Sequence, residues 1–378
     1  MNKFKKDFPI DPEIIFLNHG SYGSCPISVF SDYQKWQKIL EKQPVEFFQK
    51  EIFHLLKKSR NSLSEFVGCN HDEIVFFPNP TTAVANIIHS LDLNKDDEIL
   101  MTNHEYGALV NAWKSWSKKS GAKIIQQKIS IPVDTEENFL EQFWSGVSKK
   151  TKVIFISQIT SPTALVFPVK PIIDRAKEKG ILTIIDGAHV PGHIELNINA
   201  LDCDFYTGAL HKWLCMPKGS TFLFVKYDHQ KWIKPIVRSW GKEGNDPESS
   251  EFLQNFQWQG TNDMSSYLTV PKALDYYHKY IYPQKNKCFE LNIDAYKRFE
   301  NILGTKPISN GGNWIGQMVS HPLPEETPKD LKDKLWSDYR IEIPIFEWND
   351  CKFIRSSFQI YNQSTDVDYL MNTLESIF

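Results

Sequence analysis

Four segments carry polar residues beside apolar runs, at positions where they could take part in chemistry. Asp186 follows the apolar run of IIDGAHVPG, and Lys212 lies 26 residues later in YTGALHKWLCMPKG. Arg355 is flanked by apolar residues in FIRSSFQIYN, and Thr81 and Thr82 follow Pro-Asn-Pro in FFPNPTTAVANII. A carboxylate, an amine, a guanidinium and two hydroxyls could together form one binding site.

The two threonines sit where a helix would begin. Free N–H groups, two hydroxyls and the helix dipole form an anion site suited to a phosphate, and a simple threonine cap is the alternative. An acid such as Asp186 at the end of a buried strand is costly unless it meets a positive partner, for example a protonated pyridine nitrogen. Its alternative role is to cap the next turn. His189, three residues on, could reach a phenolic oxygen or a substrate.

Lys212 is a candidate nucleophile, because an amine must be neutral to attack an aldehyde. An apolar loop that also holds His211 and Trp213 would lower the pKa of this amine, whereas the alternative is an ordinary surface lysine. Arg355 inside an apolar strand suits bidentate recognition of a carboxylate, with a structural salt bridge as the alternative. The chain order of phosphate cup, acid, lysine and arginine predicts one cofactor site.

The elements that must position these residues alternate along the chain. Residues 26–68 have apolar residues spaced three and four apart, which predicts helices. From residue 74, short runs such as KVIFIS and ILTIID alternate with helical segments of 10–15 residues. This pattern predicts βαβ crossovers and a mostly parallel sheet covered on both faces. In such a sheet, ligands gather at the carboxyl ends of the strands.

A second, smaller α/β pattern follows Gly304. The stretch WGKEGNDPESSEFLQNFQWQGTND breaks the first rhythm with glycine, proline and charge, and it leads into helices at 265–280 and near 285–303. We therefore expect a large and a small domain with a boundary near 263–284, as a chain of 378 residues allows.

Composition excludes several classes of protein. The net charge is −3 and no Lys/Arg block stands out, so we expect no nucleic-acid partner. We expect no signal peptide, because MNKFKKDFPIDPEIIF lacks an apolar core, and no membrane span. The six cysteines are scattered without a CxxC or a metal-like Cys/His pairing, which predicts reduced thiols in the cytoplasm and no metal site.

The sequence resembles the class-V aminotransferases, which are fold-type-I pyridoxal-phosphate (PLP) enzymes, and most of all their isopenicillin N epimerase-like branch. The motifs that carry the resemblance span most of the chain: FLNHGSYGSCP, NHEYGALVNAW, SQITSPTALVFPV, IIDGAHVPG, YTGALHKWLCMPKG and WQGTNDMS. The resemblance implies an α/β fold with a mostly parallel seven-stranded sheet in a large PLP-binding domain (26–263). An N-terminal arm (1–25) would line the active site, and a small α/β domain (264–378) would complete it.

The resemblance also implies roles for single residues. Lys212 matches the Schiff-base lysine, Asp186 the partner of the pyridine nitrogen, and His189 the residue near the phenolic oxygen. Tyr106 matches the ring that stacks on the cofactor, with His104 as the competing choice. The cofactor, mainly on its phosphate side, would be contacted by Thr81, Thr82, Ser161, Thr207 and His211. Gly260 and Thr261 would belong to a loop that reaches the phosphate from the second subunit of a homodimer. The substrate would be contacted by Asn18, His19 and Arg355.

Two positions depart from the family pattern. Ala209 stands where relatives carry a polar residue two before the histidine of the His-Lys pair, so one phosphate contact is expected to be missing. Ala164 replaces a glycine expected after TSPT. Neither change touches the lysine or the acid.

The resemblance leaves the reaction open, because a fold does not set function. In the family pattern, cysteine desulfuration needs a reactive cysteine on a loop about fifteen residues before the carboxylate-binding arginine. Arg340 occupies that position in this chain, and the nearest cysteine, Cys351, is expected in the same strand as Arg355. Epimerisation needs a second acid on the opposite face, for which Tyr106 or His19 is a candidate.

Other reactions remain as alternatives. Carbon–sulfur lyases such as hercynylcysteine sulfoxide lyases share the NHG opening and the His-Lys pair, and transamination is a third reading. A PLP-fold protein used for binding alone is a hypothesis from another class. The block HEYGALVNAW favours the epimerase branch. The side chain of the amino-acid substrate is not indicated, because the aromatic residues near the entrance are read mainly as packing.

Overall fold

The computed structural model describes residues 3–248 and 250–378. Its largest element is a seven-stranded sheet in the order β2-β8-β7-β6-β5-β3-β4. Strand β8 is antiparallel to both of its neighbours, and the pairs β7–β6, β6–β5, β5–β3 and β3–β4 are parallel. The strands are β2 (Ile74–Phe77), β3 (Glu98–Thr102), β4 (Lys123–Gln127), β5 (Thr151–Ser157), β6 (Leu182–Asp186), β7 (Phe205–Ala209) and β8 (Thr221–Val225). The expected mostly parallel sheet is confirmed.

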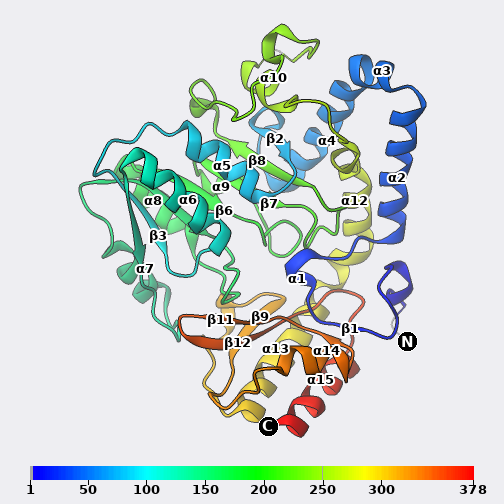
Figure 1. Cartoon of the computed structure of the whole chain (residues 1–378), viewed down its shortest axis with the longest axis vertical. Helices are drawn as coiled ribbons and strands as arrows, with labels where there is room; N and C mark the ends of the chain where they lie inside the picture. Colours follow the sequence, from blue (N-terminus) through cyan, green and yellow to red (C-terminus); the bar gives the residue numbers. More distant parts are fainter. Residues whose placement is uncertain (1–2, 249) are drawn as a thin grey trace.

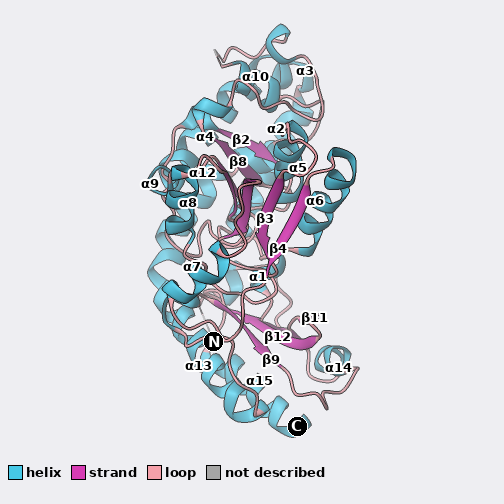
Figure 2. Cartoon of the chain, turned by 90° about the vertical axis from the view of Figure 1, so that its left-hand side faces the viewer, coloured by secondary structure: helices cyan, strands magenta, loops and turns pink. Residues whose placement is uncertain are grey.

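Helices cover both faces of this sheet (Figures 1 and 2). Successive strand residues face opposite sides, so Ile154 and Ile156 join one apolar core while Val153 and Phe155 join the other. The helices of this part are α2 (Ile27–Lys42), α3 (Pro44–Glu46), α4 (Ile52–Val67), α5 (Pro80–Ser90), α6 (Gly107–Ser120), α7 (Glu136–Trp144), α8 (Val169–Glu178), α9 (Ile198–Leu201), α10 (Glu251–Gln257), α11 (Ser265–Leu268) and α12 (Val270–Tyr276). The helices expected within 26–68 are confirmed.

A second sheet forms the lower part of the molecule in Figure 1. It is antiparallel, with the order β11-β12-β9, and the long helices α13 and α15 pack together beside it. The helices and strands of this part of the chain are α13 (Lys285–Leu303), β9 (Met318–Pro322), α14 (Leu331–Ser337), β10 (Ile341–Glu342), β11 (Ile345–Trp348), β12 (Cys351–Ser357) and α15 (Ser364–Ile377). The division into 26–263 and 264–378 stays a proposal.

The N-terminal arm ties the two parts together. Strand β1 (Ile15–Phe16) pairs with β10 in parallel, and Asn18 bridges to Ser357 at the end of β12. The short helix α1 (His19–Tyr22) then lies between the two sheets (Figure 1). Gly23 follows with φ +68°, and a Cβ atom there would lie 2.7 Å from the Lys212 carbonyl oxygen. Only glycine allows the arm to approach the Lys212 loop so closely.

Within the described residues, no helix is long and apolar enough to cross a membrane, and no group of three or more His, Cys, Asp or Glu residues is placed to hold a metal ion.

Candidate active site

The predicted acid and lysine meet at the carboxyl ends of two neighbouring parallel strands. Asp186 is the last residue of β6 and pairs in register with Thr207 of β7. The loop between β7 and β8 carries Lys212. Strand ends of this kind are where ligands bind in open α/β sheets. The sheet order therefore brings together two residues that lie 26 positions apart.

The Lys212 amine is held near an imidazole. Its Nζ atom lies 3.0 Å from Nε2 of His189. Burial lowers the pKa of Lys212 to about 7; Asp186 opposes this shift, and Arg355 adds to it. No ion pair involves this amine among the described residues, and the lowered pKa favours its uncharged form. A neutral amine is the form that attacks an aldehyde.

Asp186 is a buried carboxyl with few partners. Its side chain is 4% exposed and accepts one hydrogen bond, of 2.9 Å, from the Ala188 N–H. Burial raises the pKa of Asp186, while the Ala188 bond and the nearby Lys212 lower it. The described residues offer no salt bridge to this carboxyl. A protonated ring nitrogen would supply the missing positive charge, so the residue fits the pyridine side of PLP.

Arg355 projects from β12 toward the same place. Its guanidinium donates to the Ser161 carbonyl oxygen and, at 2.9 Å, to Oγ of Ser21. The Nε atom is buried without a hydrogen-bond partner among the described residues, and burial lowers the pKa of Arg355 to about 10. No carboxylate of the described chain pairs with it, which rules out the structural salt bridge of the alternative reading. Ser21 was not singled out from sequence, because nothing local links it to a residue 334 positions away.

Helix α5 presents its first turn at the end of β2. Asn79 caps it, because its Oδ1 atom accepts from the Thr82 N–H at 2.8 Å and from the Thr82 hydroxyl at 3.0 Å. The alternative of a simple threonine cap is therefore wrong, because asparagine holds that position. Thr81 and Thr82 lie in the first turn, which suits an anion.

Two further phosphate-side candidates have partners within the protein. The Thr207 hydroxyl is buried and donates to the Phe222 carbonyl oxygen at 2.8 Å. Nδ1 of His211 lies 3.1 Å from the Ser220 carbonyl oxygen, and burial lowers the pKa of His211 to about 4. Ala209 ends β7 and offers no polar side chain there. Their contacts with a phosphate stay predictions.

The structure separates the two candidates for the stacking ring. Tyr106 is 46% exposed at the start of α6. His104 is fully buried, with Nδ1 at 2.7 Å from the Thr163 hydroxyl and Nε2 at 3.1 Å from the Ile129 carbonyl oxygen. Only Tyr106 therefore has a ring free to face a ligand.

The neighbouring Glu105 is a site feature that sequence reasoning missed. It is buried and accepts hydrogen bonds from the Ser157 N–H and from the hydroxyls of Ser157 and Thr102. Burial, more than the nearby Asp186, raises the pKa of Glu105 to about 7.

The two arm residues do not lie open to an entrance. His19 is fully buried, with Nδ1 at 2.7 Å from the Tyr361 hydroxyl and Nε2 at 3.1 Å from the Lys212 carbonyl oxygen. Burial lowers the pKa of His19 to about 3. Asn18 donates to Glu342 at 2.8 Å. Both side chains hold the arm and the Lys212 loop in place, and their contact with a substrate stays a prediction.

Gly260 and Thr261 stand apart from the other candidates. They lie in the turn after α10, where Gly260 has φ +113° and Thr261 is exposed. No hydrogen bond or ion pair between the described residues joins this turn to Asp186 or Lys212. Thr261 instead lines a cavity beside Trp240 and Trp258, whose lining includes neither Asp186 nor Lys212.

A buried unpaired acid, an amine of lowered pKa and an anion-binding helix start fit one class of protein, the fold-type-I PLP enzymes. The aminotransferase class-V family model matches residues 29–370, so the chain belongs to this PLP-dependent family. The expected family and cofactor are confirmed.

Known proteins with different reactions resemble the chain over its whole length. It is 28% identical to an isopenicillin N epimerase of Amycolatopsis lactamdurans, covering 99% of this chain and 97% of the relative. It is 25% identical to a probable chloroplastic L-cysteine desulfhydrase of Arabidopsis thaliana, over 97% of this chain and 83% of the relative. A solved C-DES mutant with glycine linked to its PLP cofactor has a TM-score of 0.84 at 18% identity, with 99% of each chain covered, and shows the shared fold.

Proposed function

We propose that this PLP enzyme acts at the α-carbon of an amino acid and inverts its configuration, as an epimerase or racemase. One observation carries the proposal. The Lys212 amine, whose pKa is lowered, lies near the Arg355 guanidinium, which no carboxylate of the described chain neutralises. A base and a carboxylate site on one substrate are what chemistry at an α-carbon requires. The similarity to an isopenicillin N epimerase supports the choice of epimerisation.

Each residue has a proposed task. Arg355 and Ser21 bind the α-carboxylate, and Lys212 binds the cofactor and then removes the α-proton. Asp186 holds a proton on the pyridine nitrogen, and His189 donates toward the phenolic oxygen. Bound PLP supplies an electron sink for the charge left at the α-carbon.

Inversion requires a second proton donor on the face opposite Lys212. Tyr106 suits this role better than His19, because the Tyr106 side chain is exposed whereas both His19 nitrogens are engaged inside the protein. Tyr106 would have to combine proton delivery with stacking on the cofactor.

Carbon–sulfur bond cleavage is the second candidate function. It is favoured by the similarity to a probable L-cysteine desulfhydrase, and it needs only one base and a leaving group. Cys351 opens strand β12, the strand that carries Arg355, so it does not lie on the separate loop that a persulfide carrier needs. Elimination would therefore release the sulfur group directly. Transamination stays third.

We also propose that the enzyme is a homodimer whose active site is completed by a second copy. The cavity that Thr261 lines includes neither Asp186 nor Lys212 of the same chain, which supports this assembly. A cytoplasmic location, expected from the cysteine pattern, stays part of the proposal; all six thiols are free in the described structure.

The reaction is tested by incubating the holoenzyme with single amino acids in deuterated water, followed by chiral separation and mass spectrometry. Deuterium at the α-carbon of both enantiomers supports epimerisation. Formation of pyruvate and ammonia from a cysteine derivative would instead identify the enzyme as a lyase. Formation of a keto acid together with conversion of the cofactor to its amine form would identify it as an aminotransferase. A Tyr106→Phe variant that still exchanges the α-proton but no longer inverts the α-carbon would assign Tyr106 as the proton donor on the face opposite Lys212.

A further inference from the structure

Trp213, which follows the proposed cofactor lysine, contacts the histidine beside that lysine. Its indole Nε1–H donates to Nδ1 of His189 at 3.4 Å. An indole nitrogen can donate a hydrogen bond but cannot accept one. Nδ1 of His189 therefore accepts this bond and carries no proton. The contact is incompatible with a His189 imidazolium, whose two nitrogens both carry protons.

The proton on His189 then has one possible place. A neutral imidazole holds one proton, so with Nδ1 as acceptor the proton is on Nε2. Nε2 lies 3.0 Å from Nζ of Lys212. An Nε2–H group donates, so the amine must offer its lone pair and be uncharged. Burial, more than any nearby charge, lowers the pKa of His189 well below its usual value, in agreement with this order of bonds.

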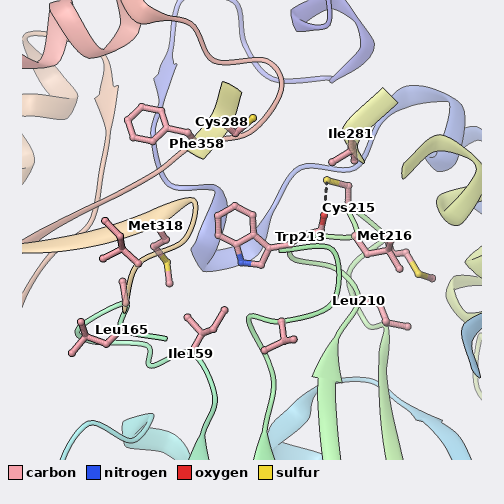
Figure 3. Packing of buried hydrophobic residues seen from close by; sticks show 14 of the residues in the cluster. Ile159, Leu165, Leu210, Trp213, Cys215, Met216, Ile281, Cys288, Met318 and Phe358 are labelled. Carbon is pink, nitrogen blue, oxygen red and sulfur yellow. Dashed lines mark hydrogen bonds between the residues drawn. The ribbon is translucent and has the colours of Figure 1, made fainter. Parts of the chain in front are cut away.

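A second histidine holds Trp213 in position. The His193 ring stacks on the indole with 3.9 Å between centroids. Its Nε2 accepts from the Gln317 N–H at 2.7 Å, so its proton is on Nδ1 and points to the His189 carbonyl oxygen at 3.0 Å. Trp213 is fully buried, and Figure 3 shows it between Met318 and Phe358 on one side and Cys215 of its own loop on the other.

We propose that Trp213 and His193 are positioning residues that fix His189 as its Nε2–H tautomer and so present Lys212 as a neutral amine before the cofactor binds. His189 then acts as a hydrogen-bond donor and never as a base. The inference rests on the proposed role of Lys212, but the tautomer exists, and is measurable, without cofactor or substrate. The other charged or titratable groups that face Lys212 or His189 are Asp186, Arg355 and His211.

The tautomer is read directly from the full-length apoenzyme by long-range proton–nitrogen correlation spectra with labelled histidine. His189→Asn assigns the signal. From about pH 5.5 to about pH 8.5, which spans the usual histidine pKa, we expect one protonated nitrogen, Nε2. A protonated Nδ1, or an imidazolium at the lower pH, would overturn the proposal without any variant of Trp213. Neither result depends on which reaction the enzyme catalyses.

The link to Lys212 is tested by the rate at which added PLP becomes covalently bound to apoenzyme as pH varies. In Trp213→Phe, His189 is free to hold its proton on Nδ1 and accept from a Lys212 ammonium. The pH midpoint for PLP capture should then rise by about one unit, the ordinary worth of one hydrogen bond.

Two controls separate positioning from general damage. Trp113→Phe is the first control, because it removes the same volume from the apolar core on the other face of the seven-stranded sheet. The Trp113 indole nitrogen is buried without a partner among the described residues, so this variant should leave the pH midpoint for PLP capture unchanged. In a His189→Asn background, Trp213→Phe should cause no further shift. An unchanged midpoint in Trp213→Phe alone, or an equal shift in both backgrounds, would refute the role.

Discussion

The two sides of the active site are built in opposite ways. The lysine pocket, made of Lys212, His189, Trp213, His193 and His19, is a closed set of hydrogen bonds inside one chain. Four of its members have side chains that are 3% exposed or less. Buried polar groups are costly without partners, and here the three histidines share partners across the arm, the Lys212 loop and the small sheet region.

The phosphate edge, made of Thr81 and Thr82 in the first turn of α5, is more open. Both side chains are half-buried, and Asn79 accepts the two hydrogen bonds that Thr82 donates within this turn. The comparison agrees with the proposal that a single chain prepares the Lys212 amine before the cofactor binds. In the proposed homodimer, a second copy adds to the anchoring of the phosphate.

The largest expected effect breaks the lysine pocket. Lys212→Ala should remove covalently bound cofactor and lower kcat by at least about 10³-fold, because the base is lost. Absorption spectra and steady-state rates measure both. Lys218→Ala is the matched control; Lys218 lies in the same loop, donates to the Gly23 carbonyl oxygen, and should retain bound cofactor. Equal losses in the two variants would contradict the assignment.

Asp186→Asn tests the acid beside the same pocket. The amide cannot hold a proton on the pyridine nitrogen, so kcat should fall by roughly 10²- to 10³-fold while cofactor stays bound. Cofactor content by absorption and kcat by product assay separate the two effects. Full activity in this variant would remove Asp186 from the proposed chemistry.

Acid should destabilise the folded protein through the buried histidines of the lysine pocket. Burial lowers the pKa of His19 and of His193 to about 3, so the unfolded chain binds more protons than the folded one as pH falls from about 6.5. Stability is then full above that pH and is lost below it.

Glu105 opposes this trend, because its raised pKa means that the folded state binds the extra proton between about pH 4.5 and pH 7. Asp186 acts in the same direction as Glu105, but the buried histidines of lowered pKa, which also include His104, His211 and His321, outnumber the two acids. The apoenzyme should therefore lose on the order of a few kcal/mol of unfolding free energy between about pH 7 and about pH 5. Urea denaturation at a series of pH values measures this. Constant or rising stability over that range would contradict the pocket's buried neutral histidines.

The smallest effect is expected at the phosphate edge. Thr82→Ala removes one hydroxyl from a half-exposed helix start, so the dissociation constant for PLP should rise about fivefold, with kcat little changed at saturating PLP. Titration of apoenzyme with PLP gives the value. Ser90→Ala, at the far end of α5, serves as control. A loss of kcat in Thr82→Ala as large as that in Asp186→Asn would contradict the proposed difference between the phosphate edge and the lysine pocket.

The sequence was sufficient to predict the parts that depend on local pattern. Apolar runs predicted the buried strands, and Asp186 at the end of one run lies at the end of β6 as expected. Lys212 stood out only through its order with the acid, the threonines and the arginine. Its loop position after β7 is confirmed by the structure.

Contacts between distant segments could not be predicted in this way. Ser21 reaches Arg355 because the arm threads between the two sheets, and no local pattern encodes that path. In the sequence, Trp213 is one more apolar residue beside Lys212, and only the structure gives the direction of its N–H bond to His189. Asn79 is the cap of α5, although the two threonines that follow it are also common cap residues.

All of the proposed chemistry depends on Lys212 being the residue that binds the cofactor. The most direct test is borohydride reduction of the wild-type holoenzyme, followed by proteolysis and mass spectrometry of the cofactor-bearing peptide. The account predicts one modified site, at Lys212 in the peptide that also contains Trp213. Cofactor attached to a different lysine, or no attachment in a protein shown to bind PLP, would contradict it.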